Sequence, residues 1–251
     1  MIEIDRVLDR LDRYLAEKDM ESAERHLKYW ISEVEQEGDK ASLLPLQNEL
    51  MGLYRTLGRR EDCLSVADQV LNLIEKMRLA DSPVLGTTLI NAATGYGAFG
   101  YAEKAIPLFR RAQKIYEAVL SPEDGRLGAL YNNMALSIGA MGALDEAEKL
   151  FAKALDVMAG VAGGEMEMAV TYCNRTNLYE EDETDSIIRQ CLVEARALLN
   201  TEGLPRDSRY ALTCEKCSSA FERFGQAEFA AELLGRAREI RRKLSESVFD
   251  D

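Results

Sequence analysis

Histidine is almost absent from this chain, and its scarcity removes several kinds of chemistry. His26 is the only histidine among 251 residues. A histidine-based metal cluster or a Ser-His-Asp site needs such a side chain together with well-placed partners. Because His26 lies within an amphipathic helical pattern beside Leu27 and Trp30, we interpret it as a partly buried packing residue. No nucleophile, base and orienting group gather elsewhere in the pattern. We therefore expect a non-enzyme with no catalytic residue, no metal and no cofactor.

Positive charge is also in short supply. The chain carries 31 Lys and Arg against 44 Asp and Glu, a formal net charge of −13. This balance argues against nucleic acid and against an anionic membrane surface as the main partner. No apolar run approaches the ~20 residues that a membrane helix requires, and the charged N-terminus has no signal-peptide core. We expect a cytoplasmic protein that binds neither nucleic acid nor membrane.

Cysteine and proline are few and scattered. Five cysteines, an odd number, do not make a disulfide framework, and we expect reduced thiols. Cys214 and Cys217 form a C-x-x-C within a predicted helix, where packing thiols are expected rather than a redox motif. With so little proline and so much Ala, Leu, Glu, Lys and Arg, helix is predicted nearly everywhere. Four of the five prolines are expected at the starts of helical hairpins, where proline is tolerated: Pro45, Pro83, Pro122 and Pro205.

One segment of the chain occurs twice. Residues 88–105 read TLINAATGYGAFGYAEKA, and residues 130–147 read LYNNMALSIGAMGALDEA. Six identities recur 42 positions apart: Asn91, Ala93, Gly97, Ala98, Gly100 and Ala105 return as Asn133, Ala135, Gly139, Ala140, Gly142 and Ala147. A fixed period of this size is typical of stacked repeat proteins.

The period predicts a single all-α solenoid domain over 1–251, in which each hairpin covers the apolar face of its neighbour. About six antiparallel helical hairpins are expected, at about 2–36, 42–79, 83–120, 123–159, 165–200 and 206–245. Within a hairpin, a turn glycine is expected between the helices at Gly58, Gly100, Gly142 and Gly225. The fifth hairpin carries the acidic run 180–185 instead, which we interpret as a solvated turn, with a docking patch for a basic partner as the alternative.

These residues resemble the tetratricopeptide repeat (TPR), in the 42-residue form found in kinesin light chain. The resemblance depends on Asn-Asn-Met-Ala at 132–135, the spacing from turn glycine to alanine, Pro107 within Ala-Ile-Pro-Leu-Phe, and Arg111-Ala112 followed by Tyr116-Glu117. It implies a right-handed α-solenoid superhelix. It also implies that the first helices of the hairpins line a concave groove, in which asparagines bond the backbone of an extended peptide or partner helix.

The positions that match this pattern fall in two adjacent columns, which we take as the candidate peptide-binding groove. Asn48, Asn132 and Asn174 share one column; Asn91 and Asn133 share the other, which continues at Arg175. Arg55 is expected to tune selectivity. An Asn amide offers a donor and an acceptor together, so it can satisfy both backbone groups of an extended strand. In the alternative interpretation these amides bond between neighbouring hairpins and only hold the repeats together.

The leading functional hypothesis is a non-catalytic interaction module that binds a protein or peptide partner. One alternative is a stand-alone bacterial sensor of a small signalling peptide, because such regulators use similar repeats. Another is a homo-oligomeric scaffold, a homodimer through the C-terminal hairpin.

The last predicted helix is basic, in contrast to the acidic whole. Its cations are Arg236, Arg238, Arg241, Arg242 and Lys243. We interpret them as charges placed favourably near a helix C-terminus, with a site for an anionic partner as the alternative.

Overall fold

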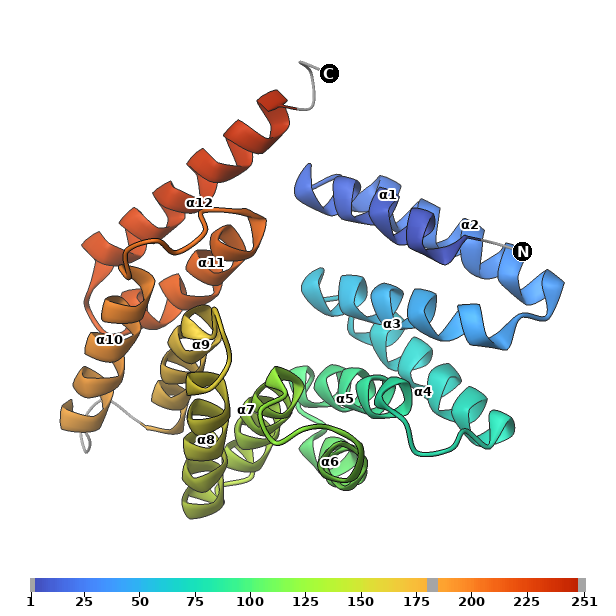
Figure 1. Ribbon diagram of the computed structural model, residues 1–251, viewed down its shortest axis with the longest axis horizontal. Helices are drawn as coiled ribbons and strands as arrows, with labels where there is room; N and C mark the ends of the chain where they lie inside the picture. Colours follow the sequence, from blue (N-terminus) through green and yellow to red (C-terminus); the bar gives the residue numbers. More distant parts are fainter. Residues whose placement is uncertain (1–2, 180–184, 248–251) are drawn as a thin grey trace. The chain divides into compact units, whose positions relative to one another are not determined.

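The computed structural model describes residues 3–179 and 185–247, and the secondary structure of these residues is helical throughout (Figure 1). The all-α, TPR-like fold class is confirmed. The structure divides into two compact units, Met1–Leu120 and Ser121–Asp251. That residues 1–251 form one solenoid domain stays a prediction.

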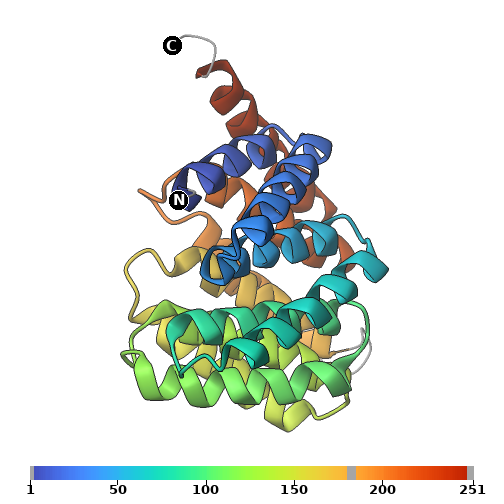
Figure 2. The same cartoon turned by 90° about the vertical axis from the view of Figure 1, so that its right-hand side faces the viewer.

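Each unit contains six α-helices in the part that the structure describes. The first unit consists of α1 (Ile4–Ala16), α2 (Met20–Glu37), α3 (Lys40–Thr56), α4 (Arg60–Met77), α5 (Pro83–Ala98) and α6 (Ala102–Val119). The second consists of α7 (Gly125–Ala140), α8 (Leu144–Ala159), α9 (Glu165–Arg175) with the 3-10 turn η1 (Thr176–Leu178), α10 (Asp185–Leu199), α11 (Ser208–Arg223) and α12 (Ala227–Ser247). Consecutive helices pair as hairpins, and Figure 2 shows such pairs in a second view.

The turn glycines adopt the backbone conformation that ends a helix. Gly58, Gly100, Gly142 and Gly225 all have positive φ, between 68° and 83°, which glycine adopts without the steric cost that a Cβ brings. In the third hairpin the N–H of Gly100 donates a hydrogen bond to the carbonyl of Gly97, and the N–H of Tyr101 donates one to the carbonyl of Tyr96. These bonds satisfy carbonyls that the end of the helix would otherwise leave unpaired.

Two further glycines let the helices of a hairpin approach closely. A Cβ on Gly86 of α5 would lie 2.1 Å from the ring of Tyr116 on α6. A Cβ on Gly128 of α7 would lie 2.6 Å from Met158 on α8. Gly86 and Gly128 are one repeat period apart, and so are Tyr116 and Met158. The same packing therefore occurs in two hairpins: a large side chain on the second helix fills the space beside a glycine on the first.

Neighbouring hairpins are joined by tyrosine–carboxylate contacts. Tyr54 of α3 donates to Glu24 of α2 at 3.1 Å, and Lys28 and Arg59 pair with the same carboxylate at 2.6 Å each. The hydrogen bond from Lys28, aided by Tyr54 and the positive charges, lowers the pKa of Glu24. Tyr96 of α5 repeats the arrangement with Asp68 of α4. Tyr54 and Tyr96 therefore hold the repeats together.

The expected position of one proline is wrong. Pro45 lies inside α3 and not at its start. The helix begins earlier because the Asp39 carboxylate accepts the backbone N–H groups of Ala41 and Ser42, each at 3.2 Å. Such an N-cap satisfies donors that have no partner within the helix.

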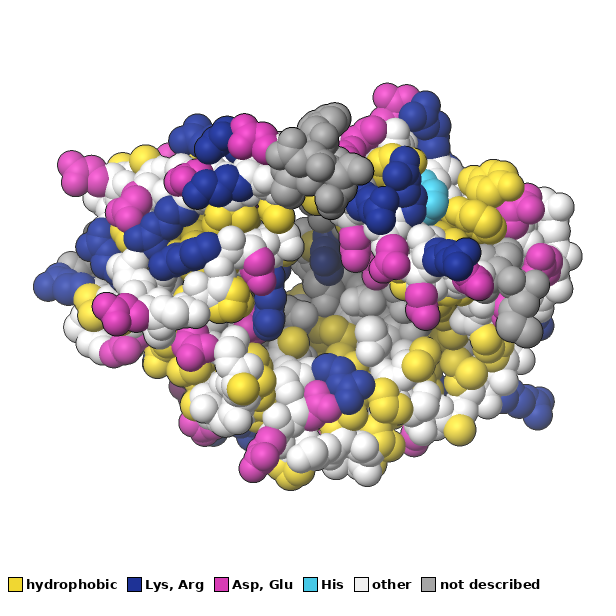
Figure 3. Space-filling view, turned by 45° about the horizontal axis from the view of Figure 1, so that its top comes forward, with side chains coloured by type: hydrophobic (Ala, Val, Ile, Leu, Met, Phe, Trp, Pro, Cys, Tyr) yellow, Lys and Arg dark blue, Asp and Glu magenta, His cyan; other side chains and the backbone are white. Residues whose placement is uncertain are grey.

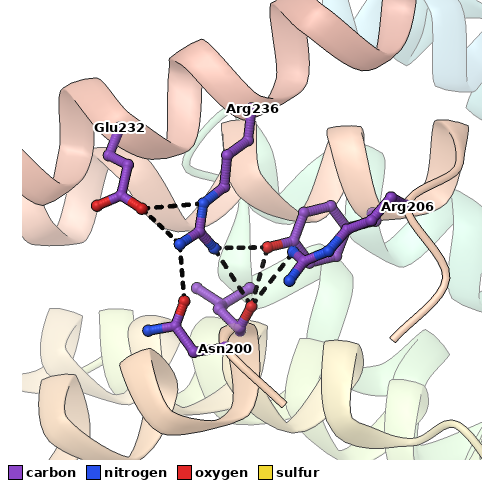
Figure 4. Close-up of polar contacts among 6 residues, drawn as sticks. Asn200, Arg206, Glu232 and Arg236 are labelled. Carbon is purple, nitrogen blue, oxygen red and sulfur yellow. Dashed lines mark hydrogen bonds and ion pairs between the residues drawn. The ribbon is translucent and has the colours of Figure 1, made fainter. Parts of the chain in front are cut away.

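Hydrogen bonds from Arg236 link α12 to the C-terminal end of α10 (Figure 4). Its guanidinium donates to Tyr210 Oη at 2.7 Å, to Asn200 Oδ1 at 2.7 Å and to Glu232 at 3.1 Å. It also reaches the Leu199 carbonyl at 3.4 Å, one of the carbonyls that the C-terminus of a helix leaves unpaired. Arg206 stacks on the Tyr210 ring, 4.0 Å from its centre.

The interpretation of the basic helix as a macrodipole effect is wrong, because α12 continues to Ser247 and has no basic residue in its last turn. Four of its five cations pair with carboxylates instead, Arg236 among them with Glu232. Arg241 pairs with Glu215 of α11 at 2.7 Å, and Arg242 and Lys243 pair with glutamates of α12 itself.

Candidate functional site

The first helices of the three hairpins in the second unit line a cavity of about 370 Å³. Its floor and walls come from α7, α9 and α11, with one side chain from α8. The lining residues are Gly128, Ala129, Asn132, Asn133, Met158, Glu167, Val170, Thr171, Arg209, Leu212, Thr213 and Lys216. Two of the asparagines expected in the groove are thus in the wall of a cavity. That they bind a ligand stays a prediction.

A chain of amides runs along this wall. Asn174 Nδ2 on α9 donates to Asn132 Oδ1 on α7 at 3.0 Å, and Asn132 Nδ2 donates to Asn133 Oδ1 at 3.2 Å. Asn132 is therefore engaged at both ends, and its bond with Asn174 joins two hairpins. Asn133 Nδ2 donates no hydrogen bond within the described part of the chain, and the half-buried Asn133 is one of the residues that line the cavity.

A charged pair forms another part of the wall. Glu167 Oε1 on α9 accepts from Arg209 of α11 twice, from Nε at 3.2 Å and from Nη2 at 2.6 Å. Glu167 Oε2 is buried and has no hydrogen-bond partner among the described residues. Neither residue of this pair was among those predicted for the groove. The sequence could have indicated the pair, because Glu167 and Arg209 are 42 positions apart and so occupy the same place in successive repeats.

The remaining wall is largely apolar. Leu212 of α11 keeps 44% of its surface exposed, while Met158 lies buried beneath the cavity. The hydroxyls of Thr171 and Thr213 bond carbonyls one turn back in their own helices, at 2.8 and 3.0 Å. The cavity therefore combines an apolar surface with a few placed polar groups, as binding pockets commonly do.

Arg175 is directed toward α8 and does not line this cavity. Its guanidinium pairs with Glu148 at 2.7 Å, and Tyr179 donates to the same carboxylate. Burial disfavours the charged form of Arg175, but the hydrogen bond and charge of Glu148 outweigh burial and raise its pKa. Burial, together with the same carboxylate, raises the pKa of Tyr179 to about 12. These contacts join α9 to the preceding hairpin.

The first unit holds the other three expected groove residues. Asn48 Nδ2 on α3 donates to Thr88 Oγ1 on α5 at 3.1 Å, so this amide also links successive hairpins. Asn91 on α5 and Arg55 on α3 are half-buried, and burial lowers the pKa of Arg55. A ligand role for all three stays a prediction.

His26 is a packing residue, as the sequence indicated. Its Nε2 donates to the Val7 carbonyl at 2.9 Å, and its ring packs edge-on against Tyr14 and Trp30. Figure 3 shows the histidine, in cyan, at the surface beside hydrophobic side chains. Within the ranges described, no three metal-ligating side chains gather in a way that can hold an ion.

The C-x-x-C cysteines are buried, which confirms that they pack in the helix interface. Burial raises the pKa of Cys214 to about 12, and a hydrogen bond with Cys173 together with burial raises that of Cys217. Protonated thiols are poor nucleophiles. Residues 180–184 of the acidic run lie outside the described residues. None of the helices that the structure describes is long and apolar enough to cross a membrane.

Comparison with known proteins places the fold. No family model and no curated protein matches the sequence. Among solved structures, TPR-like repeats from a kinesin light chain of Podosopora anserina superpose with a TM-score of 0.50 at 19% identity, covering 80% of this chain and 96% of that one. A Rap protein in complex with Competence and Sporulation Factor gives 0.64 at 15% identity, covering 98% and 66%. NprR in complex with its cognate peptide NprX gives 0.61 at 16% identity, covering 98% and 71%. The chain therefore has the TPR-like repeat fold of these structures.

Proposed function

We propose that the second unit binds a peptide, or an extended segment of a partner protein, in the cavity lined by α7, α9 and α11. The observation that carries the proposal is the position of Asn133, which lines the cavity together with the exposed Leu212 and whose Nδ2 donates no hydrogen bond among the described residues. A backbone carbonyl of the ligand accepts from Asn133 Nδ2, and an apolar side chain packs on Leu212. A volume of about 370 Å³ accommodates a few residues of such a segment.

Within this proposal the asparagines have different roles. Asn132 and Asn174 bond each other and hold the helices in register, so they position the wall. Asn133 contacts the ligand. The ligand-binding interpretation therefore applies to Asn133, and the interpretation as bonds between hairpins applies to Asn132 and Asn174. An amide that bridges two hairpins has fewer groups left for a ligand.

A pull-down from native lysate tests the proposal, with both proteins and small peptides identified by mass spectrometry. Asn133→Ala should lose the specific partners that the unaltered chain retains. Asn72→Ala, an exposed asparagine on α4, is the matched control and should retain them. Circular dichroism must show equal helicity and thermal stability for all three proteins. Retention of the same partners by Asn133→Ala would overturn the proposal.

A sensor of a small signalling peptide is the second candidate function. Two of the similar structures are described with a signalling factor or a cognate peptide bound, and the cavity is small enough for a short free peptide. Enrichment of the small-peptide fraction, without any retained protein, would favour this form of the function.

A further inference from the structure

Arg55 of α3 differs from the other half-buried arginines of the chain. In the part of the chain that the structure describes, five arginines are half-buried. Four of them pair with a carboxylate within 2.7 Å: Arg59, Arg175, Arg236 and Arg241. The side chain of Arg55 forms no ion pair and no hydrogen bond with a described residue. All five of its N–H donors therefore lack a protein acceptor.

An unpaired guanidinium in this position is costly. Arginine is rarely buried without a partner, because a charge taken out of water loses its solvation. Burial is accordingly what lowers the pKa of Arg55. Besides burial, the only influence on this pKa among the described residues is Cys63, so no described carboxylate lies close enough to balance the charge. A ligand that brings an anion to Arg55 removes this cost.

The guanidinium of Arg55 can be reached by a ligand. Among the residues described, the polar atoms that are both fully enclosed and without a partner belong to Gln47, Asn48 and Glu167. The nitrogens of Arg55 are not among them, so they keep accessible surface. Gly52 lies one turn earlier on the same face of α3, and its Cβ position has no atom within 4 Å. Open space therefore lies beside Arg55.

We propose that Arg55 binds a carboxylate of a peptide ligand at the first unit. This inference rests on the proposed function in that its ligand is a peptide, although its site belongs to the other unit. A planar carboxylate matches the two parallel N–H donors of a guanidinium. A single cation also balances one negative charge, whereas a phosphate group carries nearly two at pH 7. The carboxylate is that of an Asp or Glu side chain or of the peptide C-terminus.

A synthetic library of random hexapeptides tests the inference, made once with free and once with amidated C-termini. Peptides retained by the purified chain are sequenced by mass spectrometry. We expect peptides with Asp, Glu or a free C-terminus to be enriched by about tenfold over their uncharged amide equivalents, as one charge-assisted hydrogen bond provides. Loss of this enrichment on amidation identifies the C-terminal carboxylate, and its persistence identifies a side chain.

Three variants separate the charge effect from a folding defect. Arg55→Gln removes the charge and should abolish the preference for carboxylates without lowering thermal stability, because no ion pair is lost. Arg55→Glu reverses the charge and should replace this preference by one for Lys- and Arg-containing peptides, a gain that a folding defect cannot produce. Arg13→Gln is the matched control. Arg13 is an exposed arginine on α1 whose side chain also has no partner among the described residues, so this variant removes the same charge and should behave as the unaltered chain.

The outcomes distinguish the inference from the proposed function. A carboxylate preference that persists in Arg55→Gln, or that Arg13→Gln loses as well, overturns the inference. Peptides that bind through Asn133 without any such preference overturn it too, and leave the function standing. A preference that depends on Arg55 but not on Asn133 supports the inference and overturns the role of the cavity in the second unit. If the unaltered chain enriches no peptide, both fail.

Discussion

Asn174 Nδ2 on α9 donates to Asn132 Oδ1 on α7 across 3.0 Å, and this bond connects the first helices of two successive hairpins. Asn133, the next residue after Asn132, lies at the end of the same amide chain and bonds no second hairpin among the described residues. Two adjacent asparagines therefore differ in what they do for the fold.

Substitution of the two asparagines should separate stability from binding. Asn132→Ala removes a bond between hairpins and is expected to lower the free energy of unfolding by about 1 kcal/mol. Asn133→Ala is expected to change it by less than about 0.5 kcal/mol while abolishing partner retention. Urea denaturation measures the free energy of unfolding of each variant. Equal destabilisation by the two variants would contradict the division of roles.

The close approach of α5 and α6 gives a second prediction. Gly86→Ala places a methyl group against the ring of Tyr116, and such overpacking should cost about 1–3 kcal/mol. Gly52→Ala is the matched control, because this helical glycine in the same unit has no atom within 4 Å of its Cβ position. It should stabilise the protein by about 0.5–1 kcal/mol. Thermal unfolding that shifts in the same direction for both variants would refute this account.

Glu24 makes stability depend on pH. Its pKa is lowered in the folded protein by Lys28 and then Tyr54, so its contribution is present above its ordinary value of 4.5 and is lost as the pH falls through the folded value. Glu24→Gln should cost about 1–3 kcal/mol at pH 7, and the difference from the unaltered chain should shrink below about pH 4. Chemical denaturation at a series of pH values between these two measures the difference in free energy of unfolding. A difference that does not vary with pH would argue against the lowered pKa of Glu24 as its cause.

The contacts of Arg236 require a guanidinium. Arg236→Lys keeps the positive charge but cannot reach Tyr210, Asn200 and Glu232 together, because lysine lacks the planar fork. We expect a loss of about 1–3 kcal/mol in the free energy of unfolding. Arg238→Lys, at an exposed position on the same helix, should be neutral. If the two substitutions have the same effect, the contacts in Figure 4 do not stabilise the second unit.

The repeat period carried most of the fold information in the sequence. Gly100 and Gly142 marked the turns because only glycine adopts their backbone conformation at little cost, and this requirement recurs in each hairpin. Pro45 did not mark a helix start, since the start of α3 depends on the Asp39 side chain and not on proline. The macrodipole interpretation of the basic helix was wrong as well, because the pairing of Arg241 with Glu215 depends on how α11 packs against α12.

The candidate site was less accessible from the sequence. A column of asparagines indicates which face the first helices share, but the hydrogen bonds that divide Asn132 from Asn133 depend on side-chain rotamers. Glu167 and Arg209 were missed because their types differ, so a search for repeated identities passes over them. Opposite charges one period apart would have revealed the pair.

The open turns have a consequence for engineering. Gly58, Gly100, Gly142 and Gly225 have no atom within 4 Å of a built Cβ, and in the second unit Gly142 lies outside the cavity lining. Exposed loop tips of this kind tolerate inserted sequence. A short tetracysteine or epitope tag spliced after Gly142 would report on the chain in living cells while leaving α7, α9 and α11 free to engage a partner.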